Sequence, residues 1–260
     1  MIVPLLHRMS HLQKLTLYLR IRNRNAFVDG THLHNEILVH MPHLHTFIFY
    51  ISTDNDINGF VHYVSANDIQ RTFKTIGYKP TTCIVNYFHN FRVICHVFSV
   101  PFAFTHLEKI ANQFPTIIFD YVTYLSVYDV VSLNHEFFIR ICEAFPLLKY
   151  FSMMNLMMQS SNDNELKCNN NLSNLIIEYS HLTSLDIMHV NIDYVEQFLL
   201  ETKVNLPCLT DLKVNYDQLK SVTMNFTRDA TRRNCSKVKR LVIEHSKILS
   251  KDVYQYFPSL

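Results

Sequence analysis

Glycine is scarce in this chain: only three occur among 260 residues, at positions 30, 59 and 77. Loops that cradle a phosphate group need glycine where the backbone must approach the ligand closely. Neither GxGxxG nor GxxxxGK[ST] can be written with these three residues, so the common nucleotide-binding loops are excluded. We therefore expect no nucleotide cofactor, and no other cofactor is indicated.

Paired cysteines, long apolar runs and an excess of charge are also missing. The six cysteines form no CxxC pair, which favours reduced, buried thiols in a cytoplasmic protein over a secreted disulfide scaffold. No apolar stretch approaches the roughly 20 residues of a membrane helix. The net charge of +2 is too small to indicate nucleic acid or an anionic membrane as a partner. We expect a cytoplasmic protein that binds neither.

Motifs of catalysis and metal binding are likewise absent. The chain has no GxSxG elbow and no HExxH, and its aspartates lack the spacing and the glycine of a calcium loop. Five histidines lie close together, but without a supporting motif ordinary polar histidines are favoured over zinc ligands. They are His32, His34, His40, His43 and His45. The sequence therefore predicts no catalytic residue and no metal site, and a protein that is not an enzyme.

A basic stretch, RDATRRNCSKVKR, begins at Arg228 and ends at Arg240. Binding to nucleic acid combines clustered positive charge with aromatic side chains on which bases stack. No aromatic residue interrupts this stretch. It is interpreted as a solvated helix end and loop.

The chain does have a recurring nine-residue phrase in which apolar residues occupy the fourth, seventh and ninth positions. It reads MSHLQKLTL, MPHLHTFIF, FPLLKYFSM, YSHLTSLDI, LPCLTDLKV and CSKVKRLVI, with FPTIIFDYV as a poorer copy anchored on Ile117 and Val122. The first anchors, at positions 12, 44, 117, 148, 182, 209 and 238, are 32, 73, 31, 34, 27 and 29 residues apart. The interval of 73 is about two periods, and the others lie at or slightly above the length of a leucine-rich repeat.

The alternating end of each phrase predicts a short strand, and amphipathic helices are expected between the strands. The ranges 105–114, 134–145 and 192–202 read as helices, and the first of them carries a capping-box pattern, Thr105 with Glu108. The chain is thus predicted to be a single α/β leucine-rich-repeat solenoid over residues 1–260, a curved right-handed arc of parallel strands with outer helices. Both ends of the sequence look truncated, so the chain is expected to be a piece of a longer protein.

Residues 54–104 break the pattern and are predicted to be an irregular repeat or an insertion. A capped helix that ends near Gly77 is expected first. The segments TTCIVNYF and FRVICHVFSV, separated by His89 and Asn90, are then expected to form a hairpin. A doubly wound α/β domain is the competing architecture for the whole chain.

The repeated [MF]-P-x-L phrases and YSHLTSLDI, on units of 27–34 residues, resemble the leucine-rich-repeat portion of F-box proteins. In that family an N-terminal F-box docks on the adaptor of a cullin-RING ubiquitin ligase, and the repeats capture the substrate. An F-box opens with an LPxEIL-like phrase, which this sequence lacks. The resemblance therefore implies a substrate-recognition part, with access to the ligase adaptor only through a missing F-box.

We expect a protein-binding module whose partner lies on the concave strand face. Side chains that alternate with the core positions point to that face, and aromatic residues dominate binding hot spots. The predicted partner-binding residues are Tyr18, Tyr50, Tyr150, Thr16, Ile48, Ser152, Asp186, Lys213 and Arg240. The alternatives are a non-solenoid α/β domain with an unrecognised catalytic activity, and a fragment with no function of its own.

Overall fold

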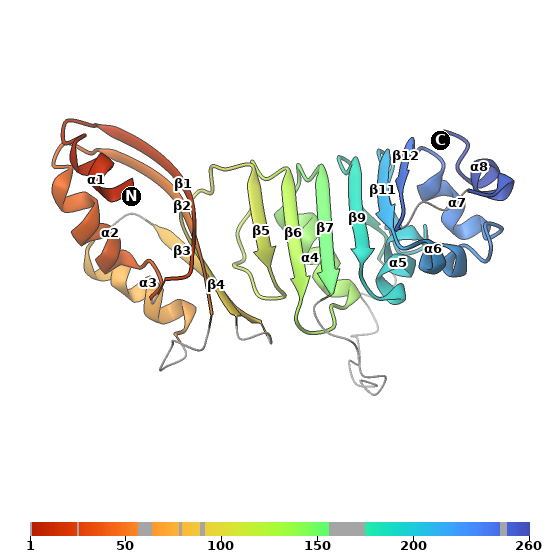
Figure 1. Ribbon diagram of the computed structural model, residues 1–260, viewed down its shortest axis with the longest axis horizontal. Helices are drawn as coiled ribbons and strands as arrows, with labels where there is room; N and C mark the ends of the chain where they lie inside the picture. The colour runs from red at the N-terminus through yellow and green to blue at the C-terminus, as the bar shows by residue number, and fades with distance from the viewer. Residues whose placement is uncertain are drawn as a thin grey trace. The chain divides into compact units, whose positions relative to one another are not determined.

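The protein divides into two compact α/β units, so the predicted α/β class is confirmed. The structure is a computed structural model that describes residues 2–24, 26–56, 64–77, 80–88, 92–155, 175–244 and 249–260. Unit 1 comprises Met1–Phe104 with Gln113–Pro115, and unit 2 comprises Thr105–Asn112 with Thr116–Leu260. Figure 1 labels most of the helices and strands of both units.

Unit 1 is built on a mixed four-stranded sheet. Its elements are α1 (Ile2–His7), β1 (Lys14–Arg22), α2 (Gly30–Glu36), a 3-10 turn (Leu38–His40), β2 (Thr46–Asp56), α3 (Ala66–Thr75), β3 (Thr81–Phe88) and β4 (Arg92–Ser99). The strand order is β1-β2-β4-β3, with β1 parallel to β2 and β4 antiparallel to both of its neighbours. Phe47 and Phe49 of β2 belong to the core on the helical side, where Phe49 stacks on Phe73 of α3 at 6.1 Å.

The helix and the hairpin predicted between residues 54 and 104 are both present. Ser65 caps α3 and forms a capping box with Asp68, and Gly77 adopts a φ of +66° just after the helix. A left-handed residue without a Cβ at this position ends a helix without steric cost. β3 and β4 pair antiparallel, while the predicted turn at His89 and Asn90 lies outside the described residues. The antiparallel pair departs from an all-parallel array.

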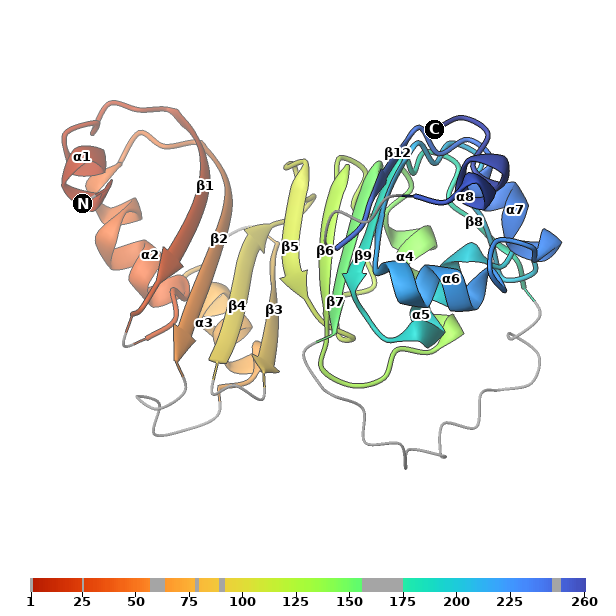
Figure 2. The same ribbon diagram turned by 45° about the vertical axis from the view of Figure 1, so that its right-hand side comes forward.

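Unit 2 is built on a six-stranded parallel sheet. Its elements are β5 (His106–Ile110), β6 (Tyr124–Asp129), α4 (His135–Ala144), β7 (Tyr150–Asn155), β8 (Ile177–Glu178), β9 (Ser184–His189), α5 (Ile192–Leu199), β10 (Val204–Asn205), β11 (Asp211–Val214), α6 (Tyr216–Val222), α7 (Asp229–Cys235), β12 (Arg240–Val242) and α8 (Lys251–Tyr256). The order is β12-β11-β9-β7-β6-β5, and β8 pairs with β10 in a second, two-stranded sheet. Figure 2 shows α4, α5 and α6 on the same side of the six-stranded sheet, unlike a doubly wound domain, which has helices on both faces.

The same turn precedes each of the strands that the recurring phrase predicts in unit 2. At β7, the N–H of Leu148 donates to the carbonyl of Phe145 at 3.2 Å. Two consecutive N–H groups, of Lys149 and Tyr150, then donate to the carbonyl of Thr123, the residue just before β6, both at 2.9 Å. Equivalent pairs of hydrogen bonds, each from two consecutive N–H groups, reach the carbonyls of Thr105, Lys149, Thr183 and Thr210. This backbone pattern fixes the register of neighbouring strands, so that equivalent side chains align across the sheet.

The core of unit 2 lies between the parallel sheet and the helices. One aligned row is fully buried across five strands, and its members are Leu107, Leu125, Phe151, Leu185 and Leu212. From the helical side, Phe198 of α5 approaches the ring of Phe151 at 5.5 Å and that of Phe138 in α4 at 5.1 Å. The helices predicted after Asn134 and at 192–202 are therefore confirmed, with α5 ending at Leu199.

Two sequence predictions in unit 2 are wrong. The range 105–114 was expected to be a capped helix, but His106–Ile110 forms strand β5, and Thr105 Oγ1 contacts the ring of its neighbour His106 instead of a helical N–H. Pairing with β6 overrides the local helix signal here. The phrase placed on Ile117 is also shifted: the aligned anchors are Val122, Leu125 and Val127, all completely buried.

Cysteines were expected to be buried and reduced. Cys83, Cys95 and Cys235 are buried free thiols, whereas Cys208 is free but exposed. Within the described residues, no helix has both the length and the apolar character needed to cross a membrane.

Helix α4 provides a local test of the capping interpretation. The Asn134 side chain accepts a hydrogen bond from the N–H of Phe137 at 3.0 Å. Asn134→Ala removes this acceptor, so we expect a loss of about 1 kcal/mol in the stability of α4, whereas Asn134→Ser retains a capping oxygen and should lose less. Amide hydrogen exchange in residues 135–144 measures the difference, and equal exchange in the two variants would contradict the capping role.

Candidate binding surface

The face of the six-stranded sheet opposite α4, α5 and α6 is here called the open face (Figure 2). Its members alternate with the buried row along the strands. They are His106, Glu108, Tyr124, Ser126, Tyr128, Tyr150, Ser152, Met154, Ser184, Asp186, Asp211, Lys213, Arg240 and Val242. The strand register aligns residues from distant parts of the chain on this one face.

Aromatic rings form a stacked row across the first three strands of this face. His106 of β5 stacks on Tyr124 of β6 with ring centroids 5.1 Å apart, and Tyr124 stacks on Tyr150 of β7 at 4.4 Å with only 7° between the ring planes. Stacking of this kind contributes beyond simple burial, on the order of 1 kcal/mol for a pair. The row therefore presents a rigid, half-buried aromatic surface.

The adjoining strands carry charge instead of aromatic rings. The hydroxyl of Tyr150 donates to Asp186 Oδ2 at 3.1 Å, and Lys213 Nζ donates to the same oxygen at 3.1 Å. Arg240 forms an ion pair with Asp211 on the neighbouring strand. The aromatic row is thus joined, through Asp186, to a set of cross-strand ion pairs.

Both tyrosine hydroxyls remain protonated donors at neutral pH. Burial is the main cause that raises the pKa of Tyr124 to about 12, and Tyr150 and the carboxylates of Glu108 and Asp186 add to the shift. Burial also raises the pKa of Tyr150, with the Asp186 charge as the next cause. The raised pKa values therefore reflect mainly the burial of the two phenols, with the nearby carboxylates as a lesser cause.

The predicted partner-binding residues fall into two groups. Tyr150, Ser152, Asp186, Lys213 and Arg240 lie on the open face of unit 2. Thr16, Tyr18, Ile48 and Tyr50 belong to β1 and β2 of unit 1.

The expectation that Tyr50 is available to a partner is wrong. Tyr50 is only 1% exposed, and its hydroxyl hydrogen-bonds His96 Nδ1 at 2.9 Å. The rings of Phe102 and Phe104, which follow β4, approach it at 5.6 Å and 6.2 Å. A segment distant in sequence therefore covers this side chain, although strand alternation correctly placed it on the side of the sheet opposite the core.

The open-face residues of β5 and β6 were missed: His106, Glu108, Tyr124, Ser126 and Tyr128. His106 and Glu108 lay in the predicted helix, and Tyr124, Ser126 and Tyr128 lay beyond the shifted phrase. The segment VTYLSV could have revealed Tyr124, because Val122, Leu125 and Val127 repeat the spacing of the other phrases.

The five histidines make separate contacts in the structure. His32 Nδ1 lies 2.8 Å from Asp29 Oδ1, and the ring of His43 stacks on that of His11 at 5.9 Å. No group of three or more metal-binding side chains is assembled anywhere in the part of the chain that the structure describes. The Asp54 carboxylate accepts two hydrogen bonds from Arg92, at 2.6 Å and 2.7 Å.

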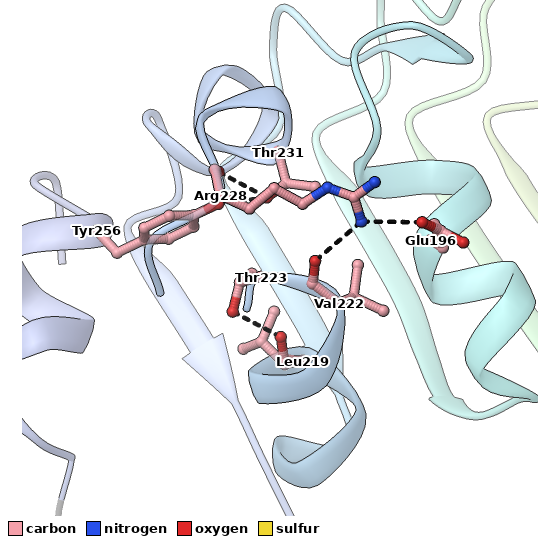
Figure 3. A network of polar contacts seen from close by, with 7 residues as sticks. All are labelled: Glu196, Leu219, Val222, Thr223, Arg228, Thr231 and Tyr256. Atoms are coloured by element: carbon pink, nitrogen blue, oxygen red, sulfur yellow. Dashed lines mark hydrogen bonds and ion pairs between the residues drawn. The ribbon is translucent and has the colours of Figure 1, made fainter. Parts of the chain in front are cut away.

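The basic stretch is engaged within unit 2. Arg228 Nη1 donates to Glu196 Oε1 at 2.9 Å and to the carbonyl of Val222 at 3.2 Å (Figure 3). Lys237 Nζ donates to the carbonyl of Pro207 at 2.7 Å. These contacts tie the start of α7 and the turn after it to α5, to the end of α6 and to Pro207, which is a structural role for part of the positive charge.

A pocket of about 200 Å³ lies beside α4, lined in part by Cys142, Glu178 and His181. These residue types can support nucleophilic chemistry, but burial raises the pKa of the Cys142 thiol and the Glu143 and Glu178 charges add to it. The thiol of Cys142 also donates to the backbone carbonyl of Glu178 at 3.3 Å. The pocket therefore offers a protonated thiol and not an activated nucleophile.

The comparisons with known proteins give no relative. No protein-family model, no curated protein and no solved structure matches this chain. The function is therefore inferred from the geometry of the open face.

Proposed function

We propose that unit 2 is part of a leucine-rich-repeat solenoid and that its open face binds a protein partner. The observation that supports this most strongly is the stacked row His106–Tyr124–Tyr150, continued by Asp186 on the next strand. Rigid aromatic side chains next to charged groups are the composition found at binding hot spots. The same turn, followed by two hydrogen bonds to one carbonyl, recurs before successive strands and supports the solenoid part of the proposal.

The resemblance to F-box proteins narrows this proposal. The protein would capture a target, as the repeats of such receptors do, without docking on the ligase adaptor, because the sequence lacks an LPxEIL-like phrase. We therefore expect the partner on the open face to be a protein that a complete F-box ubiquitin ligase recognises as a substrate.

Site-specific photo-crosslinking tests the open face directly. A photoreactive phenylalanine analogue replaces Ser184 on the open face or, as a matched control, the exposed Lys220 on α6. We expect discrete crosslinked partners from position 184 alone. Tyr150→Ala should weaken their capture by about 2 kcal/mol in binding free energy, the cost of a hot-spot truncation.

The readout is mass spectrometry of the crosslinked species, with circular dichroism to verify that Tyr150→Ala remains folded. Equal crosslinking from positions 184 and 220, or capture that Tyr150→Ala leaves unchanged, would place the binding surface elsewhere. Recovery of the ligase adaptor as a direct crosslink would contradict the narrower, target-capturing role.

A further inference from the structure

Two imidazole rings from separate segments of unit 1 lie in direct contact. His7 is the last residue of α1, and His40 ends the 3-10 turn Leu38–His40. Their ring centroids are 3.7 Å apart, with 37° between the ring planes. His7 is partly buried and His40 is exposed, so an ion from solvent can reach the pair. The contact brings together two side chains of the kind that coordinates transition metals.

A hydrogen bond fixes the tautomer of His7. Its Nε2 lies 2.8 Å from the carbonyl oxygen of Glu36. A carbonyl can only accept, so Nε2 carries the hydrogen and, in the neutral ring, Nδ1 carries the lone pair. Metal-binding histidines commonly donate their other ring N–H to a backbone carbonyl, which fixes the ring and raises its basicity. His7 therefore already has the hydrogen bond that supports Nδ1 as a ligand.

The backbone on both sides of the contact is held by the core of unit 1. Leu6, beside His7, and Met41, beside His40, are 4% and 3% exposed and belong to the same apolar cluster. The N–H of Met41 also donates to the carbonyl of Leu38 at 3.1 Å. The two rings thus extend from fixed segments, and binding of an ion needs to order only the side chains.

A shared ion requires only a small movement of the rings. Nitrogen ligands lie about 2.0–2.1 Å from Zn²⁺, and a tetrahedral angle between two imidazoles places their ring centroids about 5 Å apart. The observed separation of 3.7 Å is shorter than this by about 1 Å. Because His40 is exposed, rotation of its side chain can open the gap.

We propose that His7 and His40 bind one divalent transition-metal ion, such as Zn²⁺, Ni²⁺ or Cu²⁺, through Nδ1 of His7 and a ring nitrogen of His40. These ions favour imidazole, whereas Mg²⁺ and Ca²⁺ prefer oxygen ligands. Two imidazoles leave the other coordination positions to water. The ion links α1 to the segment that precedes β2. This site belongs to unit 1 and does not depend on the protein-binding function proposed for unit 2.

Isothermal titration calorimetry of the full chain with NiCl₂ tests the pair at about pH 7.5, where imidazole is mostly neutral. His40→Asn removes one of the two ligands and should weaken Ni²⁺ binding about 10- to 100-fold. His34→Asn, at an exposed position on α2, is the matched control, because any of the 15 histidines can contribute weak background binding. The control should retain the affinity of the unsubstituted chain.

A double-mutant cycle separates chelation from independent binding. His7→Asn combined with His40→Asn should weaken binding little more than either substitution alone, because a single remaining imidazole binds no better than the other histidines. His40→Cys supplies a thiolate, which is a zinc ligand, and should retain Zn²⁺ binding that His40→Asn loses. This rescue distinguishes loss of a ligand from damage to the fold.

Amide hydrogen exchange then locates the ion. Saturating Zn²⁺ should slow exchange in residues 2–9 and 36–41, which the ion links, and leave residues 205–222 of unit 2 unchanged. Three results would overturn the inference: equal Ni²⁺ affinity of His40→Asn and the unsubstituted chain, an equal loss with His34→Asn, or no slowing of exchange in residues 2–9. Any of them would leave the two rings as an ordinary stacking contact.

Discussion

Asn234→Ala is expected to lower the stability of unit 2 by about 3–5 kcal/mol, because it leaves several buried backbone groups without a partner. Asn234 lies in α7 and is 1% exposed. Its Oδ1 accepts from the N–H of Leu206 at 3.0 Å, and its Nδ2 donates to the carbonyls of Val204, Leu199 and Phe198 at 2.7, 3.2 and 3.3 Å. One side chain thus holds the end of α5 and strand β10 against α7.

Hydrogen exchange followed by mass spectrometry is the appropriate measurement, because a chain with two compact units need not unfold in a single transition. Faster exchange should be confined to residues 175–244, with residues 26–56 of unit 1 as the internal control. Asn234→Asp keeps the acceptor for Leu206 but loses the donors and buries a charge, so it should also be strongly destabilised. A protection pattern unchanged by Asn234→Ala would show that these hydrogen bonds contribute little.

Phe198→Ala is expected to cost unit 2 about 3–5 kcal/mol, since it creates a cavity in the core. Phe198 is completely buried in α5. Its ring centroid lies 5.1 Å from that of Phe138, 5.5 Å from Phe151 and 6.4 Å from Tyr179. Removal of the ring therefore breaks contacts between α4, α5 and the six-stranded sheet at the same time.

Phe198→Leu is the matched control, because it keeps most of the apolar volume and should be destabilised much less than Phe198→Ala. Urea unfolding followed by far-ultraviolet circular dichroism, with hydrogen exchange to assign the transition to unit 2, gives the two stability differences. Similar values for the leucine and alanine variants would mean that the site collapses around the smaller side chain, and that the aromatic cluster is not the centre of the core.

Local pattern predicted many elements of this protein correctly. The capped helix before Gly77, the antiparallel pair β3 and β4, and the helix that begins after Asn134 were all predicted from short segments. Each depends on interactions between residues close in sequence, such as a side chain that caps the helix beginning beside it. Signals of this kind are present in the sequence itself.

Strand β5 shows where local pattern misleads. Thr105 and Glu108 have the spacing of a capping box, yet residues 106–110 pair with β6 as a strand. A helix signal of a few tenths of a kcal/mol per residue is easily overcome by burial of Leu107 and Ile110 in the sheet. That burial depends on β6, whose own phrase was placed five residues too early.

Only part of the candidate site was predicted, again because contacts between distant strands are not visible in a short segment. Alternation along each strand correctly placed Tyr150, Ser152, Asp186, Lys213 and Arg240 on one face. It could not show that Tyr150 would stack on Tyr124, nor that it would donate to Asp186, 36 residues away along the chain. Those contacts depend on the register between strands.

The sequence by itself determined the α/β class, the recurring strand phrase and the direction in which alternate side chains point, because these follow from the spacing of apolar residues along short segments. Only the tertiary structure decided which of those side chains are accessible. Tyr50 and Tyr150 both alternate with the core positions of their strands, yet Tyr50 is buried and Tyr150 lies half-buried on the open face. The difference comes from Phe102 and Phe104, which pack against Tyr50 from a segment some fifty residues further along the chain.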